Sequence, residues 1–418
     1  MRHQMTARGL PLLGLLALVA CHKGAPGSGT SADAGAGTAA ASAASSAQPA
    51  VVPARCKGAG AGAALVDAGG ADELEIGDAV AVDGGGWAVG IVHRVGSSRM
   101  AAIAFLTAEA TGLRVVDLAP TLGDAPPPHL AARGPDLLAG SYVVSKRPDV
   151  RELALYVVPK AGDPRVVATI PQQRDDSLAF DVAPGLVVWD EASTGPSPRG
   201  IIRAAELLPG DQVGPAHDVS PADSDAEMPR LEGSSVFWLA RRPEAQVPDA
   251  SAPAEAVGDV RAYSWLESSG TSPRRLTSAS GHVSAYDVEP LAGGDALLVA
   301  RDDGEQVDGS GGVLLRVRVH AAGSADPPLA LPGDGLGRGA PIFIDGAAPW
   351  ISWIGPHEAA RLLPLDASGA PVGPPSAELE LDDARPLAFL RGSSAPRILA
   401  AAPGDATAQL RVLACSQP

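Results

Sequence analysis

Short apolar runs recur along most of this 418-residue chain at nearly constant spacing, and this regularity limits the possible folds more than any other feature. The first residues of successive runs are 47 to 60 residues apart, and each run follows a turn signal rich in Gly, Pro or Ser. The seven runs begin at Trp87, Leu137, Leu186, Val236, Ala296, Trp350 and Arg397. A repeat near 50 residues is typical of propellers and solenoids.

The pattern within each repeat is that of short β-strands. The second repeat, for example, offers apolar segments at 137–144, 152–158, 165–170 and 177–182, separated by turn residues. Pro is spread so evenly that few helices could exceed about ten residues. We therefore predict an all-β chain in which residues 55–418 form a seven-bladed β-propeller of four-stranded antiparallel blades. The alternative, two β-sandwich domains, does not account for the regular spacing.

The last repeat lacks strands at the C-terminus, since it offers only residues 397–401 and 409–414. Segments 63–67 and 73–82 are available to complete it. An N-terminal strand that closes the last blade would satisfy its open edge.

The repeats resemble those of the TolB-like and WD-repeat propeller families in strand–turn layout, over about 360 residues. The patterns that end in Trp189, Trp238 and Trp353 fit strands that pack against neighbouring blades. The resemblance implies architecture only. The families' Ser-Pro-Asp-Gly turn is missing and no Trp-Asp dipeptide ends a strand in register, so no functional residue is carried over.

The N-terminus has the features of an export signal. Arg2 and Arg8 precede an apolar run, residues 10–20. That run is too short to cross a bilayer, which needs about 20 helical residues, and it fits the apolar region of a signal peptide.

The run ends in Leu18-Val19-Ala20-Cys21, which resembles the bacterial lipobox. The resemblance implies that residues 1–20 are a removed signal peptide and that Cys21 becomes the lipidated N-terminus. His22 replaces the Asp that retains such proteins at the inner membrane, which implies outer-membrane placement, on the periplasmic side or at the surface. The alternative is an ordinary secretory signal with an incidental Cys.

Residues 21–54 are predicted to be the lipidated Cys followed by a disordered tether. From Gly24 to Ala50 nearly every residue is Ala, Gly, Ser, Thr or Pro, and Asp33 is the only charge. No large apolar side chain is available to offset the entropy of folding. An Ala-rich helix is the alternative, which the interspersed Gly and Ser residues disfavour.

The remaining two of the three cysteines bracket the repeat region. Cys56 lies at its start and Cys415 three residues before the end of the chain. Disulfides persist in exported proteins, so we predict a Cys56–Cys415 bond; two free thiols are the alternative.

Composition and motifs exclude several functions. A net charge of -16, with 32 Lys and Arg against 48 Asp and Glu, argues against a nucleic-acid partner. Nucleophile-elbow and phosphate-loop motifs are missing, and His357-Glu358 is followed by Arg361 where a zinc motif needs His. The acidic segments 223–227 and 302–308 are interpreted as solvated loops. We predict no catalytic, cofactor-binding or metal-binding residue, and no cofactor.

These observations predict a lipid-anchored envelope protein whose propeller is a non-enzymatic binding or scaffold module. Its partner would be an envelope protein or a cell-wall component. The alternative is a propeller-type enzyme acting on glycans or lactones at the central channel. Two or more buried acidic, His or Arg side chains at the channel mouth would favour the enzyme or a metal site.

Overall fold

The computed structural model describes part of the chain, and all described residues belong to the unit Ala50–Pro418. The described ranges are 55–58, 63–65, 74–108, 112–147, 150–173, 178–194, 199–233, 235–241, 258–264, 273–279, 281–291, 293–303, 312–321, 324–332, 342–345, 350–354, 359–381, 384–391, 396–402 and 408–415. Cys21, the predicted signal peptide and the predicted tether lie outside them. Among the described residues, no helix has the length and apolar character needed to cross a bilayer.

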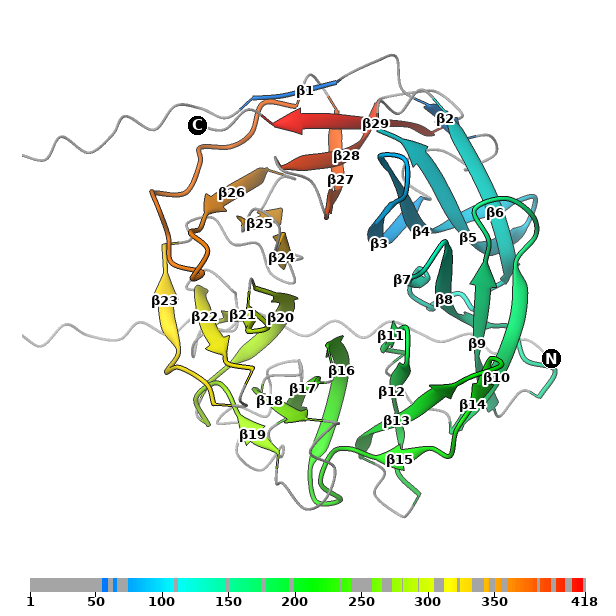
Figure 1. Cartoon of the computed structure of the whole chain (residues 1–418), viewed down its shortest axis with the longest axis horizontal. Helices are drawn as coiled ribbons and strands as arrows, with labels where there is room; N and C mark the ends of the chain where they lie inside the picture. Colours follow the sequence, from blue (N-terminus) through cyan, green and yellow to red (C-terminus); the bar gives the residue numbers. More distant parts are fainter. Residues whose placement is uncertain are drawn as a thin grey trace, which may run out of the picture. The chain divides into compact units, whose positions relative to one another are not determined.

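The described strands form six antiparallel sheets arranged around a common centre, which is the arrangement of a β-propeller (Figure 1). The first sheet contains β3 (Glu75–Val82), β4 (Gly86–Val95), β5 (Ser98–Thr107) and β6 (Leu113–Pro120). The second contains β7 (His129–Arg133), β8 (Asp136–Val143), β9 (Val150–Val158) and β10 (Arg165–Gln173). The third contains β11 (Phe180–Ala183), β12 (Leu186–Ala192), β13 (Gly200–Leu208), β14 (Gln212–Val213) and β15 (His217–Asp218).

The fourth sheet is twice as large, with eight strands. It contains β16 (Asp225–Glu232), β17 (Ser235–Arg241), β18 (Gly258–Ser264), β19 (Arg274–Arg275), β20 (Val283–Pro290), β21 (Ala296–Asp302), β22 (Val313–Val319) and β23 (Leu329–Leu331). The fifth contains β24 (Ile342–Asp345), β25 (Trp350–Ile354) and β26 (Ala360–Pro364). The last contains β27 (Arg385–Leu390), β28 (Arg397–Ala402), β29 (Ala408–Cys415), β1 (Cys56–Gly58) and β2 (Ala63–Leu65).

The prediction of seven four-stranded blades is therefore wrong, although the all-β propeller is confirmed. Two consecutive repeats, β16–β19 and β20–β23, are joined into one sheet because Gly258 of β18 pairs with Val283 of β20. Sequence spacing reveals repeats, but it does not show whether strands of neighbouring repeats also form backbone hydrogen bonds. Sheets ringed around one centre also rule out the β-sandwich alternative.

The predicted grouping of strands was shifted by one. Segment 177–182 is the last one predicted for the second repeat, yet β11 is the innermost strand of the third sheet, and β7 is likewise the innermost strand of the second. Each repeat therefore starts one strand before its apolar run. The polar ends of these short strands face the centre, which is why the apolar pattern did not mark them as the start of a unit.

The predicted closure by an N-terminal strand is present, with a correction to the segments that make it. Strands β1 and β2 both pair with β29, and Cys56 lies directly opposite Cys415 in that pairing. Segment 73–82 instead supplies β3 of the first sheet. The N-terminal segment is also held by the Cys56 amide, which donates to the Glu380 carbonyl at 3.1 Å.

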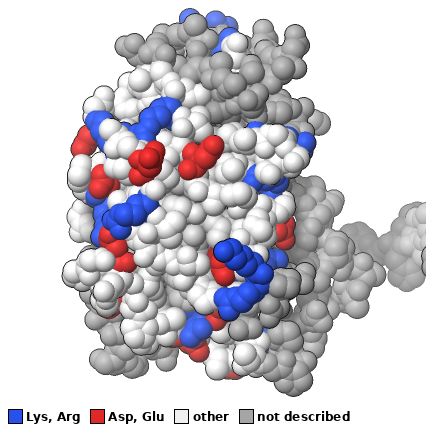
Figure 2. Space-filling model, turned by 90° about the vertical axis from the view of Figure 1, so that its right-hand side faces the viewer, with Lys and Arg blue, Asp and Glu red and all other residues white. Residues whose placement is uncertain are grey.

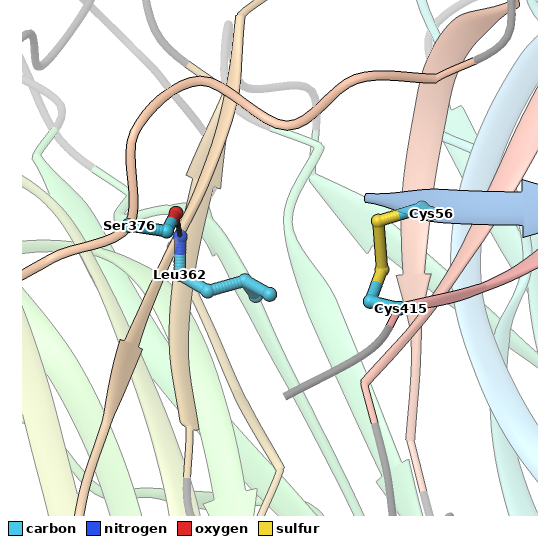
Figure 3. The surroundings of a disulfide bond; sticks show 4 residues. All are labelled: Cys56, Leu362, Ser376 and Cys415. Carbon is cyan, nitrogen blue, oxygen red and sulfur yellow. Dashed lines mark hydrogen bonds between the residues drawn. A yellow bond between two sulfur atoms is a disulfide. The ribbon is translucent and has the colours of Figure 1, made fainter. Parts of the chain in front are cut away.

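The predicted disulfide between Cys56 and Cys415 is confirmed (Figure 3). Both cysteines are buried, and they share a hydrophobic cluster with Leu362 of β26 and Leu413 of β29. Near it, the Leu362 amide donates to the Ser376 hydroxyl at 3.0 Å. The bond therefore lies in the core between the last two sheets and joins the two ends of the unit.

Apolar side chains fill the space between adjacent sheets, as the repeat pattern predicts. Trp189, Trp238 and Trp353 are fully buried, which confirms the packing predicted for them, and Trp87 and Trp350 are nearly so. The remaining Trp265 lies outside the described residues. Burial of aromatic area of this size is a main source of core stability.

Glycines in the second strands allow adjacent sheets to approach closely. A Cβ added to Gly90 of β4 would lie 2.0 Å from the Pro128 carbonyl oxygen, just before β7. A Cβ added to Gly140 of β8 would lie 2.6 Å from the Phe180 ring of β11. Both glycines are the fourth residue of their apolar runs, so the first two repeats have a small residue where the next innermost strand passes, whereas the third has Trp189 at that position.

Charged side chains on the right-hand side of the view in Figure 1 are mixed in sign. Figure 2 shows basic and acidic residues interspersed there, without a patch of one sign. The predicted solvated loop at 223–227 is partly wrong, because Asp225 starts β16 and Glu227 is buried and paired with Arg241.

Candidate functional site

Four innermost strands bring charged side chains together at the centre. Strands β3, β7, β11 and β16 lie side by side around the inner edge (Figure 1). They carry Asp78, His129, Asp181 and Arg230, respectively. Because the innermost strand of each sheet is nearest to the axis, these residues from distant parts of the chain converge. We call these four residues the central cluster.

His129 lies between two carboxylates. Its Nδ1 is 2.9 Å from Asp78 Oδ2 and 3.6 Å from Asp181 Oδ1. The His129 side chain is only 13% exposed, and its ring packs edge-on against Phe180 at 4.7 Å between centroids. Its position is thus fixed both by ion pairing and by packing.

These neighbours change the proton equilibrium of His129. Burial disfavours the charged imidazolium, but the Asp78 charge and the hydrogen bonds to Asp181 and Asp78 outweigh it and raise the pKa of His129 to about 9. Burial likewise opposes ionisation of Asp78, yet the positive charge of His129 holds the pKa of that carboxyl well below its usual range. At neutral pH the pair is an imidazolium and a carboxylate.

Arg230 completes the central cluster. Its Nη1 is 3.2 Å from His129 Nδ1. Burial opposes its charge, but Asp78, Asp181 and Asp287 outweigh that effect and raise the pKa of Arg230, so it stays cationic. Among the described residues, this approach to His129 is the one close side-chain contact of the guanidinium, and it joins two donor groups because His129 Nδ1 carries a proton.

A second group of charges lies on β20 and after β27. Arg391 Nη2 is 3.1 Å from Asp287 Oδ2, and Arg391 Nη1 pairs with Glu289. The Arg391 carbonyl accepts the indole N–H of Trp87 at 2.9 Å. These contacts tie β20, the last sheet and the first sheet together. We interpret this group as mainly structural, because each charge in it is paired.

Burial raises the pKa of Asp287, and it has the same effect on Glu232, at the end of β16. Burial raises its pKa to about 7, reinforced by the charges of Asp181 and Asp287 and opposed by Arg391. It is therefore partly protonated at neutral pH. A carboxylic acid of this kind beside ionised carboxylates is a common feature of acid–base sites.

A pocket of about 310 Å³ opens beside His129 and Arg230. Its other lining residues are Asp124, Pro126, Leu178, Ala179, Phe180, Met228 and Pro229. Two cationic side chains thus form part of a mainly apolar wall. Such a combination of apolar lining with a few polar groups is typical of small-ligand sites.

The central cluster could in principle ligate a metal ion, since one atom each of Asp78, His129 and Asp181 lie within 4.8 Å of one another. Zinc requires a deprotonated imidazole nitrogen. Here the two carboxylates stabilise the proton on Nδ1, and the Arg230 cation is 3.2 Å away. The residues therefore fit an ion-pair network better than a metal centre.

The sequence analysis, which predicts no catalytic, cofactor-binding or metal-binding residue, does not single out this cluster. The sequence does carry a signal for the cluster, namely the spacing of its members. Asp78, His129, Asp181 and Arg230 follow one another at intervals of 51, 52 and 49 residues, close to the repeat period. Polar residues at one phase of a propeller repeat share one level of the central channel. Buried acidic, His and Arg side chains at the centre are also the feature expected to favour an enzyme or metal site over a simple scaffold.

Comparison with known proteins establishes the fold and no more. No family profile and no curated protein sequence matches the chain. The chain is similar to acylaminoacyl peptidase from Pyrococcus horikoshii, with a TM-score of 0.51 and 10% identity over 81% of this chain and 51% of that one. It is also similar to the β-propeller domain of the Trilobed protease from Pyrococcus furiosus (TM-score 0.48, 8% identity, 82% of this chain and 94% of that one).

A third similar structure is a polysaccharide lyase, an ulvan lyase (TM-score 0.49, 10% identity, 84% of this chain and 95% of that one). At identities this low, the similarities define a class by fold alone. The unit is a β-propeller with a charged centre.

Proposed function

We propose that this protein is a lipid-anchored propeller of the bacterial envelope that binds a small ligand at its centre. The anchor is Cys21, and the binding site is the pocket beside His129 and Arg230. This keeps the binding role expected from the sequence but places the site on the inner strands. An outer-membrane location follows from His22 as part of the same proposal.

The observation that carries the binding role is the pocket itself. It combines a cavity of about 310 Å³ with a rigid cationic wall. That wall consists of His129 and Arg230, which come from two different sheets. Side chains held by packing and ion pairs need little reordering on binding, which favours affinity. A purely structural ion-pair network would not require an open apolar cavity next to it.

Ligand-observed NMR with a panel of small carboxylates, amines and neutral sugars tests this role. We expect at least one class to bind the wild-type protein. Filling the pocket with Ala179→Phe should abolish that signal, because Ala179 lines the cavity. Ala330→Phe, at an exposed position of β23, is the matched control and should bind as wild type. Equal binding by Ala179→Phe, or no binding by any class, would reject the site.

An enzyme acting on glycans is the second candidate, and Glu232 is the observation that favours it. A carboxyl whose pKa is about 7 can donate a proton at neutral pH while ionised Asp78 remains charged. Release of new reducing ends from a panel of neutral and acidic polysaccharides tests this activity. The enzyme proposal requires activity in the wild type and its loss in Glu232→Gln; a wild-type protein without activity on the panel would count against it.

A further inference from the structure

We infer that the central ligand carries a carboxylate or similar anionic group attached to an apolar body. This inference rests on the proposed binding function, and names the class of ligand that the pocket beside Arg230 would accept. It follows from which hydrogen-bonding groups around the pocket already have partners.

The carboxylates of the central cluster are already supplied with donors. Asp181 accepts the backbone amides of Val182 and Leu231, both at 2.8 Å, one on each oxygen. Asp78 accepts the His129 Nδ1–H at 2.9 Å. A cationic ligand would have to compete with these fixed donors for the same oxygens.

The carboxylates near the pocket rim have partners as well. Buried Asp190 accepts the amides of Ala179 and Met228, each at 3.1 Å, behind the pocket wall. Asp124, which lines the pocket, lies 3.5 Å from Arg151. The buried Asp190 thus has a donor on each oxygen, whereas the Asp124 side chain is 66% exposed and open to solvent.

Arg230 presents the opposite situation. An arginine has five N–H donors and no acceptor. Its contact among the described residues is the 3.2 Å approach to His129 Nδ1, whose lone pair is taken by the proton given to Asp78. Two donor groups therefore face each other beside an open cavity. An acceptor oxygen from a ligand would satisfy both, and carboxylates match the planar arginine fork.

The remaining wall defines the body of the ligand. Leu178, Phe180, Met228 and two prolines, Pro126 and Pro229, add an apolar surface to the cationic one. A volume of about 310 Å³ lies at the small end of ligand pockets, so the ligand is small. Hydrocarbon or ring carbons would be removed from water against this wall.

Isothermal titration calorimetry of the folded exported protein at pH 7 tests the inference with matched probes. The acids are hexanoate and benzoate, the neutral analogues are hexanamide and benzamide, and the cation is hexylammonium. We expect each acid to bind about tenfold or more tightly than its amide, because the amide lacks the charge that strengthens the hydrogen bonds to Arg230. Arg230→Lys keeps the positive charge but loses the planar fork, and should weaken acid binding by about tenfold.

Arg165→Gln is the control, since Arg165 lies on outer strand β10, 61% exposed and paired with Asp211. It should bind the acids as wild type does. Amides that equal the acids, or hexylammonium that exceeds them, would overturn the anionic class while leaving a central binding site in place. If none of the five probes binds wild type but another class in the NMR panel does, the class inference also fails. These comparisons use the wild-type protein, so they hold even if Arg230→Lys misfolds.

Discussion

His129 shows how the fold sets the chemistry of one residue. A histidine alone in water has a pKa near 6.5, and burial would lower it further. Here neighbouring strands supply Asp78 and Asp181. Their carboxylates outweigh the effect of burial and raise the pKa of His129 to about 9. A charged imidazolium at neutral pH is therefore a property of the closed ring, because the three residues come from three sheets.

The pH dependence of stability tests this arrangement. The folded-state pKa of His129 is raised, so its contribution is full below about pH 6.5 and is lost as pH rises through about 9. The folded-state pKa of Asp78 is lowered, so this residue stabilises the fold at pH values above its unfolded pKa of 3.8. That stabilisation is lost on acidification. The His129 shift corresponds to roughly 3 kcal/mol at most.

We predict that Asp78→Asn lowers the pKa of His129 and flattens the fall in unfolding free energy between pH 6.5 and 9. Urea unfolding at a series of pH values, with NMR titration of the His129 ring, measures both effects. Asp218→Asn removes a carboxylate that is 64% exposed and paired with Arg203, and should leave the His129 titration unchanged. A His129 midpoint near 6.5 in the wild type would show that the ion pair does not form.

At the scale of strands, a glycine in the second strand of each of the first two repeats allows the next sheet to approach closely. Gly90 of β4 lies against the Pro128 carbonyl, which directly precedes His129. An added methyl group at this position has no room unless the backbone moves. The spacing of the sheets and the position of a central-cluster residue are therefore linked.

Gly90→Ala should destabilise the protein by about 1 to 3 kcal/mol, the usual cost of overpacking a core. Thermal unfolding measures the loss. Gly185→Ala is the matched control, because an added Cβ there meets no atom within 4 Å and the φ angle is not positive. Equal stability of the two variants would contradict the close approach of β4 and the segment before β7.

The strands show what the sequence could predict and what it could not. Apolar runs such as the one at Trp87 marked second strands correctly, because their side chains pack on both faces of a sheet. The innermost strands were assigned to the wrong neighbour, since their polar positions serve the centre and break the apolar pattern. The cluster of Asp78, His129, Asp181 and Arg230 was missed for the same reason, although its spacing carried the repeat period.

At the scale of the whole unit, the ring is closed by strand pairing and by the Cys56–Cys415 disulfide. The bond joins residues 359 apart in the chain. In the chain-entropy model a loop this long gains about 6 kcal/mol from cross-linking, although native disulfides are commonly worth about 2 to 5. β1 and β2 retain their hydrogen bonds to β29 without it, so the fold should weaken rather than disappear.

The double variant Cys56→Ser, Cys415→Ser should therefore unfold at a lower temperature, with a loss of about 2 to 5 kcal/mol. Reductant should lower the wild-type melting temperature toward that of the variant and leave the variant unaffected. Thermal unfolding with and without reductant measures this. A variant as stable as the oxidised wild type would mean that the disulfide does not constrain the ring.

The lipid anchor is a further whole-molecule prediction. Cys21→Ser removes the acceptor of the proposed lipid, so the protein should move from the membrane fraction to the soluble fraction of cells. Fractionation with immunoblotting, compared with Cys56→Ser as a cysteine control, measures this. Retention of Cys21→Ser in the membrane fraction would contradict lipidation at this residue.

The most direct test of the account is a crystal structure of the unit Ala50–Pro418 soaked with hexanoate. We predict that innermost strands β3, β7, β11 and β16 surround one centre, with the hexanoate carboxylate within hydrogen-bond distance of Arg230 and its chain against Phe180. A centre in which Asp78, His129 and Asp181 lie apart, or hexanoate bound only on the outer surface, would contradict it.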